Sequence, residues 1–215
     1  MKIAIMQPYF FPYIGYFELI ASVDLFVFLE DAQFTRKGWI NRNRIRDQHS
    51  DFQYLTVPVK HCCRSTKINE IICCKDWKRL VIEKIIKTYG KLLNPAIIDA
   101  LPSHETNKLV DILKHSLRSI CKTLKISCDF ASSEGLSSKR GQGRIIDICH
   151  FFGAKEYWNL SGGVDLYNQE AFGDIKLNFM RPSRFKNNLS IVDAISVDEN
   201  EVMEYIHSKS WLQWN

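Results

Sequence analysis

A carboxylate and two side-chain amides stand near the start of the chain and could act together on one substrate. Asp31 could accept a proton, while Gln7 and Asn41 could orient a substrate and donate hydrogen bonds to an oxyanion. A carboxylate within hydrogen-bond reach of a nucleophile can accept its proton as the bond to the substrate forms. We therefore expect these three residues to be catalytic, with Asp31 as general base. The alternative is that Asp31 only pairs with Arg36 or Arg42 to hold its loop.

Residues 31–46 combine amides, cations and an aromatic ring, which suits a phosphate and a ring. A solvated basic loop is the other interpretation. The aromatic stretch 7–16 leaves the same predicted sheet edge, so we expect both segments to converge on one small-molecule pocket. That single pocket should contain Gln7, Tyr9, Gly15, Asp31, Lys37, Asn41 and Arg42. The substrate-binding residues expected from the two segments are Tyr9, Tyr13, Gly15, Tyr16, Gln33, Lys37, Trp39, Arg42 and Asn43.

Further ligand contacts are expected after later strands. Lys60 follows an apolar run and could meet a phosphate, although a lone lysine is more often a surface residue. Ser161, Gly162 and Gly163 form a tight turn after a predicted strand, where glycine lets the backbone approach a ligand. The basic, glycine-containing loop 134–143 precedes a helix. It is a weak anion signal, because it lacks both the Walker spacing and the dinucleotide fingerprint.

Buried strands and amphipathic helices must position these residues. Short apolar runs at 3–6 and 25–29 indicate two buried strands, and between them, at 14–23, apolar residues recur at helical spacing. This pattern predicts a βαβ unit with polar residues at its strand ends. Further strands are expected at 52–59, near a sheet edge, and at 68–74, 126–131, 156–160 and 175–180. Further helices are expected at 76–89, 105–124, 144–152 and, after a segment at 190–195, at 199–208. The alternation predicts an α/β fold: a mainly parallel, Rossmann-like sheet with helices on both faces.

Length and charge limit the class of protein. At 215 residues the chain suits a single domain, 1–215, with a helical insertion or subdomain at about 75–125. A net charge of +5 suits an anionic small substrate, or simply keeps the protein soluble. The sequence contains neither an apolar stretch that could span a bilayer nor a signal segment. We therefore expect a cytoplasmic protein with no membrane span, and we expect no nucleic acid partner.

Metal binding is not expected. The seven cysteines include two adjacent pairs, Cys62-Cys63 and Cys73-Cys74. Neighbouring residues of a strand point to opposite faces, so neither pair can aim two thiolates at one ion. We expect reduced thiols that serve as small apolar side chains.

Several segments together resemble the WbqC-like family of bacteria, which is named from surface-polysaccharide gene clusters. The resemblance rests on residues 6–17, 30–34, 37, 39–43, 55–59, 161–163, 167 and 190–193, and so covers nearly the whole chain. It adds Tyr167 to the expected substrate-binding residues.

The resemblance implies an enzyme of O-antigen, lipopolysaccharide or other surface-polysaccharide biosynthesis that acts on a nucleotide-linked amino sugar. Sugars of such pathways commonly carry acylated amines, so an acyl or aminoacyl transferase is the expected version. The cofactor is open: an acyl carrier or a coenzyme A thioester would supply the acyl group, and an acyl carrier protein would be the matching partner. A non-catalytic nucleotide-sugar-binding or scaffold protein of the same pathway is the second interpretation.

A nucleotidylyltransferase-like enzyme is the third. The predicted strand, the proline loop and the helix start at Gly15 are similar to the HxGH nucleotidylyltransferases, but Tyr13 and Tyr16 stand at the histidine positions. Imidazolium stabilisation of a transferred nucleotidyl group is then missing. This departure favours nucleotide binding without that chemistry.

Overall fold

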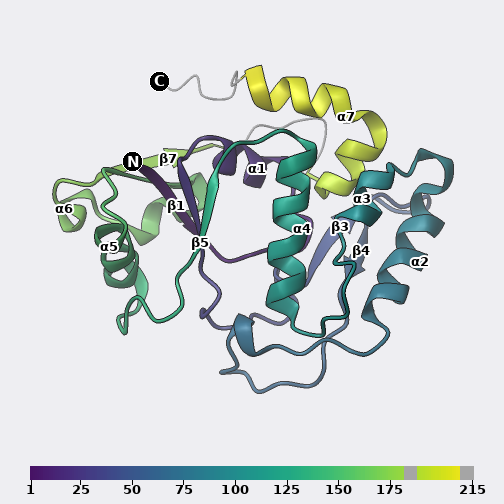
Figure 1. Cartoon of the computed structure of the whole chain (residues 1–215), viewed down its shortest axis with the longest axis horizontal. Helices are drawn as coiled ribbons and strands as arrows, with labels where there is room; N and C mark the ends of the chain where they lie inside the picture. The colour runs from purple at the N-terminus through teal and green to yellow at the C-terminus, as the bar shows by residue number, and fades with distance from the viewer. Residues whose placement is uncertain (182–187, 209–215) are drawn as a thin grey trace.

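A five-stranded parallel sheet forms the centre of the protein (Figure 1). The computed structural model describes residues 1–181 and 188–208. The strands of this sheet are β1 (Lys2–Met6), β2 (Leu25–Phe28), β5 (Asp129–Ser132), β6 (Glu156–Leu160) and β7 (Lys176–Met180). Their order is β5-β2-β1-β6-β7, and each neighbouring pair is parallel. The prediction of a mainly parallel sheet is confirmed.

The strand order creates a topological switch point between β1 and β6. The chain adds β2 and β5 on one side of β1, and β6 and β7 on the other. In open α/β sheets the connections at such a point leave in opposite directions and open a crevice at the carboxyl ends of the strands, where ligands bind. The loop after β1 and the turn after β6 both begin at this edge.

Helices cover both faces of the sheet, as the sequence predicts. Side chains alternate along β1, so Ala4 packs in one hydrophobic cluster while Ile3 and Ile5 pack in the other. The first cluster contains side chains of α1 (Ile14–Ala21), α4 (Leu109–Thr123) and α7 (Ile191–Ser208). The second contains side chains of α5 (Gly141–Phe151) and α6 (Gln169–Phe172). Figure 1 shows α5 and α6 to the left of the sheet and α4 to its right.

A separate antiparallel hairpin carries part of the polar segment that follows β2. It consists of β3 (Arg42–Ile45) and β4 (Gln53–Thr56). The strand expected at 52–59 therefore exists but is shorter, and it belongs to a second sheet instead of the main one. In Figure 1 the hairpin lies beyond α4, next to α2 (Trp77–Tyr89) and α3 (Pro95–Asp99).

Some local predictions were wrong. Residues 68–74 do not form the expected strand but contain the 3₁₀ turn η1 (Ile68–Glu70). The Glu70 carboxylate caps this turn by accepting a hydrogen bond of 2.9 Å from the backbone N–H of Lys67. The helix expected from residue 105 begins at Leu109, because Lys108 still bridges Ile72 in an extended conformation.

The later elements also differ slightly from the prediction. The strand expected at 126–131 is shifted to Asp129–Ser132. The closing helix begins at Ile191 instead of residue 199, and Asp198 interrupts it with a φ of −159°.

The range 75–125 is mostly helical and contains α2, the 3₁₀ turn η2 (Gly90–Leu92), α3 and α4. Its buried side chains share a hydrophobic cluster with those of α1 and α7. That this range forms a subdomain stays a prediction. Among the described helices, none combines the length and the apolar character needed to cross a membrane.

Candidate functional site

Buried aromatic residues hold the loop between β1 and α1. Phe10 and Phe11 are buried, and Phe11 has a φ of +41°, which non-glycine residues rarely adopt. Tyr16 is fully buried and donates its hydroxyl to Gln7 O at 2.7 Å, and burial raises its pKa well above the usual value. Gly15 is buried in the first turn of α1. Gly15 and Tyr16, both expected to bind substrate, therefore lie beneath the loop and support it.

The segment after β2 meets this loop, as its origin at the same sheet edge predicts. Phe10 N donates to Ile40 O at 2.9 Å. Ser190, just before α7, joins both parts: its hydroxyl donates to Phe11 O at 2.6 Å, and its N–H donates to Arg44 O at 2.8 Å. Three parts of the chain that are distant in sequence therefore form one wall.

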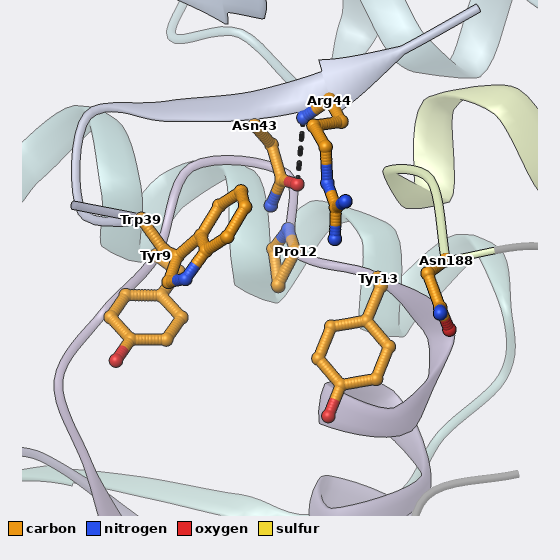
Figure 2. A pocket seen from close by; sticks show the side chains of 7 residues that line it. All are labelled: Tyr9, Pro12, Tyr13, Trp39, Asn43, Arg44 and Asn188. Atoms are coloured by element: carbon orange, nitrogen blue, oxygen red, sulfur yellow. Dashed lines mark hydrogen bonds between the residues drawn. The ribbon is translucent and has the colours of Figure 1, made fainter. Parts of the chain in front are cut away.

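A cavity of about 260 Å³ lies beside this junction, and we call it the aromatic cavity (Figure 2). Burial raises the pKa of Tyr9, and burial with the nearby Glu18 and Tyr9 raises the pKa of Tyr13 to about 12. Both hydroxyls are therefore neutral hydrogen-bonding groups near pH 7. Aromatic walls with a few polar groups are typical of small-molecule sites. The lining residues are Tyr9, Pro12, Tyr13, Trp39, Asn43, Arg44 and Asn188, of which Tyr9, Tyr13, Trp39 and Asn43 were predicted.

Arg44 lines this cavity, whereas the sequence analysis selected Arg42. The guanidinium of Arg42 lies 4.0 Å from the ring centre of Tyr54 and donates to Gly38 O at 3.3 Å and Lys37 O at 2.5 Å. Arg42 therefore holds the turn before β3. Both arginines lie on the same side of the strand, so no pattern in the sequence distinguishes them. They differ in their surroundings, because Arg42 contacts the turn before β3 and Arg44 lines the cavity. Pro12 and Asn188 also carried no sequence signal.

A second cavity, of about 220 Å³, is lined by cations from the segment after β2 and from the residues after β4, and we call it the basic hollow. Lys37, Asn41 and Lys60, all predicted, come together in it. Asn41 is buried and donates its side-chain amide to Val57 O at 2.9 Å. The lining residues are Phe34, Arg36, Lys37, Asn41, Val59, Lys60 and His61.

Asp31 follows β2 and lies at the carboxyl edge of the main sheet. It pairs with Arg144 of α5 and accepts a hydrogen bond from the Ser133 hydroxyl at 2.6 Å, so its partner is neither Arg36 nor Arg42. Burial raises the pKa of Asp31, but the bonds from Ser133 and Arg144 and the charge of Arg144 lower it more, and the pKa lies below its usual value. Asp31 is therefore ionised at neutral pH.

Glu30, the neighbour of Asp31, makes the same kind of arrangement on the opposite face of the sheet. It pairs with Lys114 of α4 and accepts a hydrogen bond from the Ser132 hydroxyl. The alternation of side chains along β2 and β5 explains why one carboxylate and one serine reach each face. We call these residues the strand-edge network: Glu30, Asp31, Lys114, Ser132, Ser133 and Arg144.

The turn after β6 is the 3₁₀ helix η3 (Ser161–Leu166), and it begins on the other side of the switch point from the loop after β1. A Cβ atom on Gly163 would lie 3.0 Å from Asn159 Nδ2 and 3.4 Å from the ring of Tyr167, so a larger residue would crowd these two side chains. Gly162 is exposed, and a Cβ atom there would meet no heavy atom within 4 Å. Gly162 therefore keeps exposed backbone at the sheet edge next to Ser161, while Gly163 and Tyr167 support the turn.

Comparison with known proteins matches the chain to a protein family. The model of the WbqC-like protein family matches residues 7–205. The chain belongs to this family. It is 31% identical over 185 residues to the uncharacterized protein Rv1507c of Mycobacterium tuberculosis, a match that covers 82% of this chain and 79% of the relative. No solved structure matches the chain.

In this WbqC-like protein the residues that were predicted to line one pocket occupy separate regions. Tyr9 lines the aromatic cavity, Lys37 and Asn41 line the basic hollow, and Asp31 lies in the strand-edge network. Gln33 is exposed, and its side-chain amide donates a hydrogen bond of 2.7 Å to the backbone carbonyl of Arg64. The catalytic and binding roles of these residues stay predictions.

No group of three or more potential metal ligands comes together within residues 1–181 and 188–208. The cysteines are free, and Cys73, Cys121 and Cys149 are buried. Burial raises the pKa of each of these buried thiols above its usual value, which suits their packing role.

Proposed function

We propose that this WbqC-like protein is a cytoplasmic enzyme of O-antigen or other surface-polysaccharide biosynthesis. It would transfer an acyl or aminoacyl group to the amine of a nucleotide-linked amino sugar. The observation that carries the proposal is the switch point between β1 and β6, because α/β sheets of this kind bind nucleotides at the strand ends beside it. The loop after β1, the carboxylates of Glu30 and Asp31 after β2, and η3 after β6 all lie at that edge of the sheet.

The diphosphate of such a substrate needs cationic or backbone donors, and the basic hollow offers the former. Lys37, Lys60 and Arg36 line it together. Arg36 and Arg42 both donate to backbone carbonyls, and Lys139 pairs with Asp147 at 2.8 Å, so Lys37 and Lys60 are the main cations offered. In this proposal the diphosphate therefore lies in the basic hollow.

In the proposed reaction the substrate amine attacks the carbonyl carbon of an acyl thioester. A C–N bond forms and the C–S bond breaks, and the proton lost by the amine passes to the Asp31 carboxylate and then to the leaving thiolate. Asp31 is ionised near pH 7, as a base must be. The oxyanion donors predicted from the sequence, Gln7 and Asn41, are kept in this proposal, which requires the substrate to bring the basic hollow and the strand-edge network together. The Asn41 amide has a second N–H for this role, since a carboxamide has two donors and one serves Val57.

A non-catalytic nucleotide-sugar-binding protein is the second candidate, and the surroundings of Asp31 favour it. Arg144 and Ser133 already engage this carboxylate, and its lowered pKa makes it a weaker base. A nucleotidylyltransferase-like reaction has less support. Tyr16, at one of the two histidine positions, is fully buried and bonded to Gln7 O.

A binding screen followed by one variant tests the proposal. Thermal-shift measurements with nucleotides and nucleotide sugars should give at least one nucleotide-sugar hit, and no hit at all would contradict the substrate class. The hit is then incubated with an acyl donor, offered both as a coenzyme A thioester and on an acyl carrier protein. Asp31→Asn should keep binding but lose turnover by about 100-fold or more, whereas the exposed control Asp99→Asn should keep both.

The outcomes separate the candidates. Unchanged turnover in Asp31→Asn would exclude the base role. Binding of a nucleotide sugar without turnover in the unmodified protein, with every donor, would favour the binding protein.

A further inference from the structure

Three arginines occupy every second position along β3 and just beyond it: Arg42, Arg44 and Arg46. Because side chains alternate along a strand, the three belong to one face of the hairpin. Arg42 donates to the carbonyls of the preceding turn, and Arg46 pairs with Asp193 at 2.6 Å. The side chain of Arg44 has neither a hydrogen bond nor an ion pair with any residue of 1–181 or 188–208, and its Nε atom is buried.

Aromatic rings hold Arg44 in place without neutralising it. The guanidinium carbon lies 5.0 Å from the ring centre of Trp39 and 5.1 Å from that of Phe52. A cation that is partly removed from water and lacks an anion is unfavourable, and buried polar atoms without partners are rare in proteins. Arg44 therefore points to an anion that residues 1–181 and 188–208 do not supply.

The surroundings of Arg44 define what carries that anion. Figure 2 shows its side chain running from β3 into the aromatic cavity, between Asn43 and Asn188, toward Pro12 and Tyr13. The rings of Tyr9, Tyr13 and Trp39 form apolar walls. The hydroxyls of Tyr9 and Tyr13 and the carboxamide of Asn188 add hydrogen-bonding groups to the lining, whereas the buried Asn43 carboxamide already bonds to the backbone. A sugar ring has matching chemistry, with C–H groups on its faces and hydroxyls around its edge.

We propose that the aromatic cavity binds a sugar ring that bears a single oxyanion, carboxylate or phosphate, paired with the Arg44 guanidinium. A guanidinium presents two parallel N–H donors that match either anion. The described lining contains one cation, Arg44, and the volume of about 260 Å³ lies just below the range of drug-sized sites. A single ring with one charged group suits this site better than a whole nucleotide with its diphosphate.

The inference goes beyond the transferase, because binding in this cavity needs neither nucleotide nor acyl donor. Its failure would leave the proposed transfer untouched, and a failure of the transfer would leave it standing.

Ligand-observed NMR titrations of the full chain test the inference with glucuronate, glucose 1-phosphate and neutral glucose. At least one anion should bind about tenfold more tightly than glucose. The preferred anion then identifies the charged group as carboxylate or phosphate. Arg44→Gln should remove the preference, whereas Arg79→Gln, which changes an exposed arginine on α2, should keep it. Circular dichroism confirms that each variant is folded.

Two results would overturn the inference: neither anion binds better than glucose, or folded Arg44→Gln keeps the preference. Arg44→Lys covers the case in which the glutamine variant does not fold. It keeps the charge but loses the two-pronged donor, so the preferred anion should bind more weakly than to the unmodified protein. Unchanged affinity in the lysine variant would also overturn the inference.

Discussion

The strand-edge network and the aromatic cavity both hold charged side chains away from water, but they treat the charge differently. In the network Glu30 faces Lys114 and Asp31 faces Arg144, and a serine completes each pair. In the cavity Arg44 has rings around it and no anion among the described residues. The comparison suggests that the network charges keep the sheet edge in place, whereas the cavity charge is open to a ligand.

Breaking the network on the α4 face should have the largest effect. Lys114→Met leaves the Glu30 carboxylate, only 3% exposed, without its cation. The free energy of unfolding should fall by about 3–5 kcal/mol, because an uncompensated buried charge is costly. Urea denaturation measures the change. Lys122→Met, at an exposed position of the same helix, is the control and should stay within about 0.5 kcal/mol of the unmodified protein. Equal effects in the two variants would contradict a structural role for the pair.

Breaking the pair on the α5 face should have a smaller, pH-dependent effect. Asp31→Asn should cost about 2 kcal/mol at pH 7, since it removes a hydrogen-bonded charge. The folded-state pKa of Asp31 is lowered, so its contribution is present above the unfolded-state pKa of about 4 and is lost as the pH falls through the folded-state value. Urea titrations from pH 7 to pH 3 should show the difference between the two proteins shrinking at the acid end. A difference that does not depend on pH would exclude the ion pair as its cause.

The turn after β6 extends the comparison to the other side of the switch point. Gly163→Ala should lower the free energy of unfolding by about 1 kcal/mol, because the new methyl group crowds Asn159 and Tyr167. Gly162→Ala is the matched control, with open space around its Cβ atom, and should be neutral or slightly stabilising. Thermal unfolding compares the two variants. If both alanines are tolerated equally, η3 is not tightly packed against β6.

Hydrophobic periodicity was sufficient for the main sheet but not for the hairpin. Strands β1, β2 and β6 are short apolar or aromatic runs, because a central parallel strand is buried on both faces. Strand β3 reads Arg-Asn-Arg-Ile, and residues of these types seldom indicate a strand. It is extended because it pairs with β4 and because Asn43 and Ile45 are buried on one side.

Part of the aromatic cavity was predictable, because two segments that follow neighbouring parallel strands leave the sheet at the same edge. Tyr9, Tyr13, Trp39 and Asn43 come from the two segments that were expected to converge, and they line one cavity. The partner of Asp31 was not predictable, because Arg144 is distant in sequence and reaches Asp31 only through the pairing of β2 with β5 and the packing of α5.

The comparison between paired and unpaired charge can be tested most directly within β3 itself. Arg44→Met and Arg46→Met remove the same group from one face of the same hairpin. Urea denaturation should show a loss of about 2–3 kcal/mol for Arg46→Met, because Asp193, with its side chain 4% exposed, loses the charge-assisted hydrogen bond from Arg46. For Arg44→Met the free energy of unfolding should change by less than about 1 kcal/mol, since only stacking on Trp39 and Phe52 is lost. A loss for Arg44→Met as large as that for Arg46→Met would show that Arg44 serves the fold, and would contradict the account.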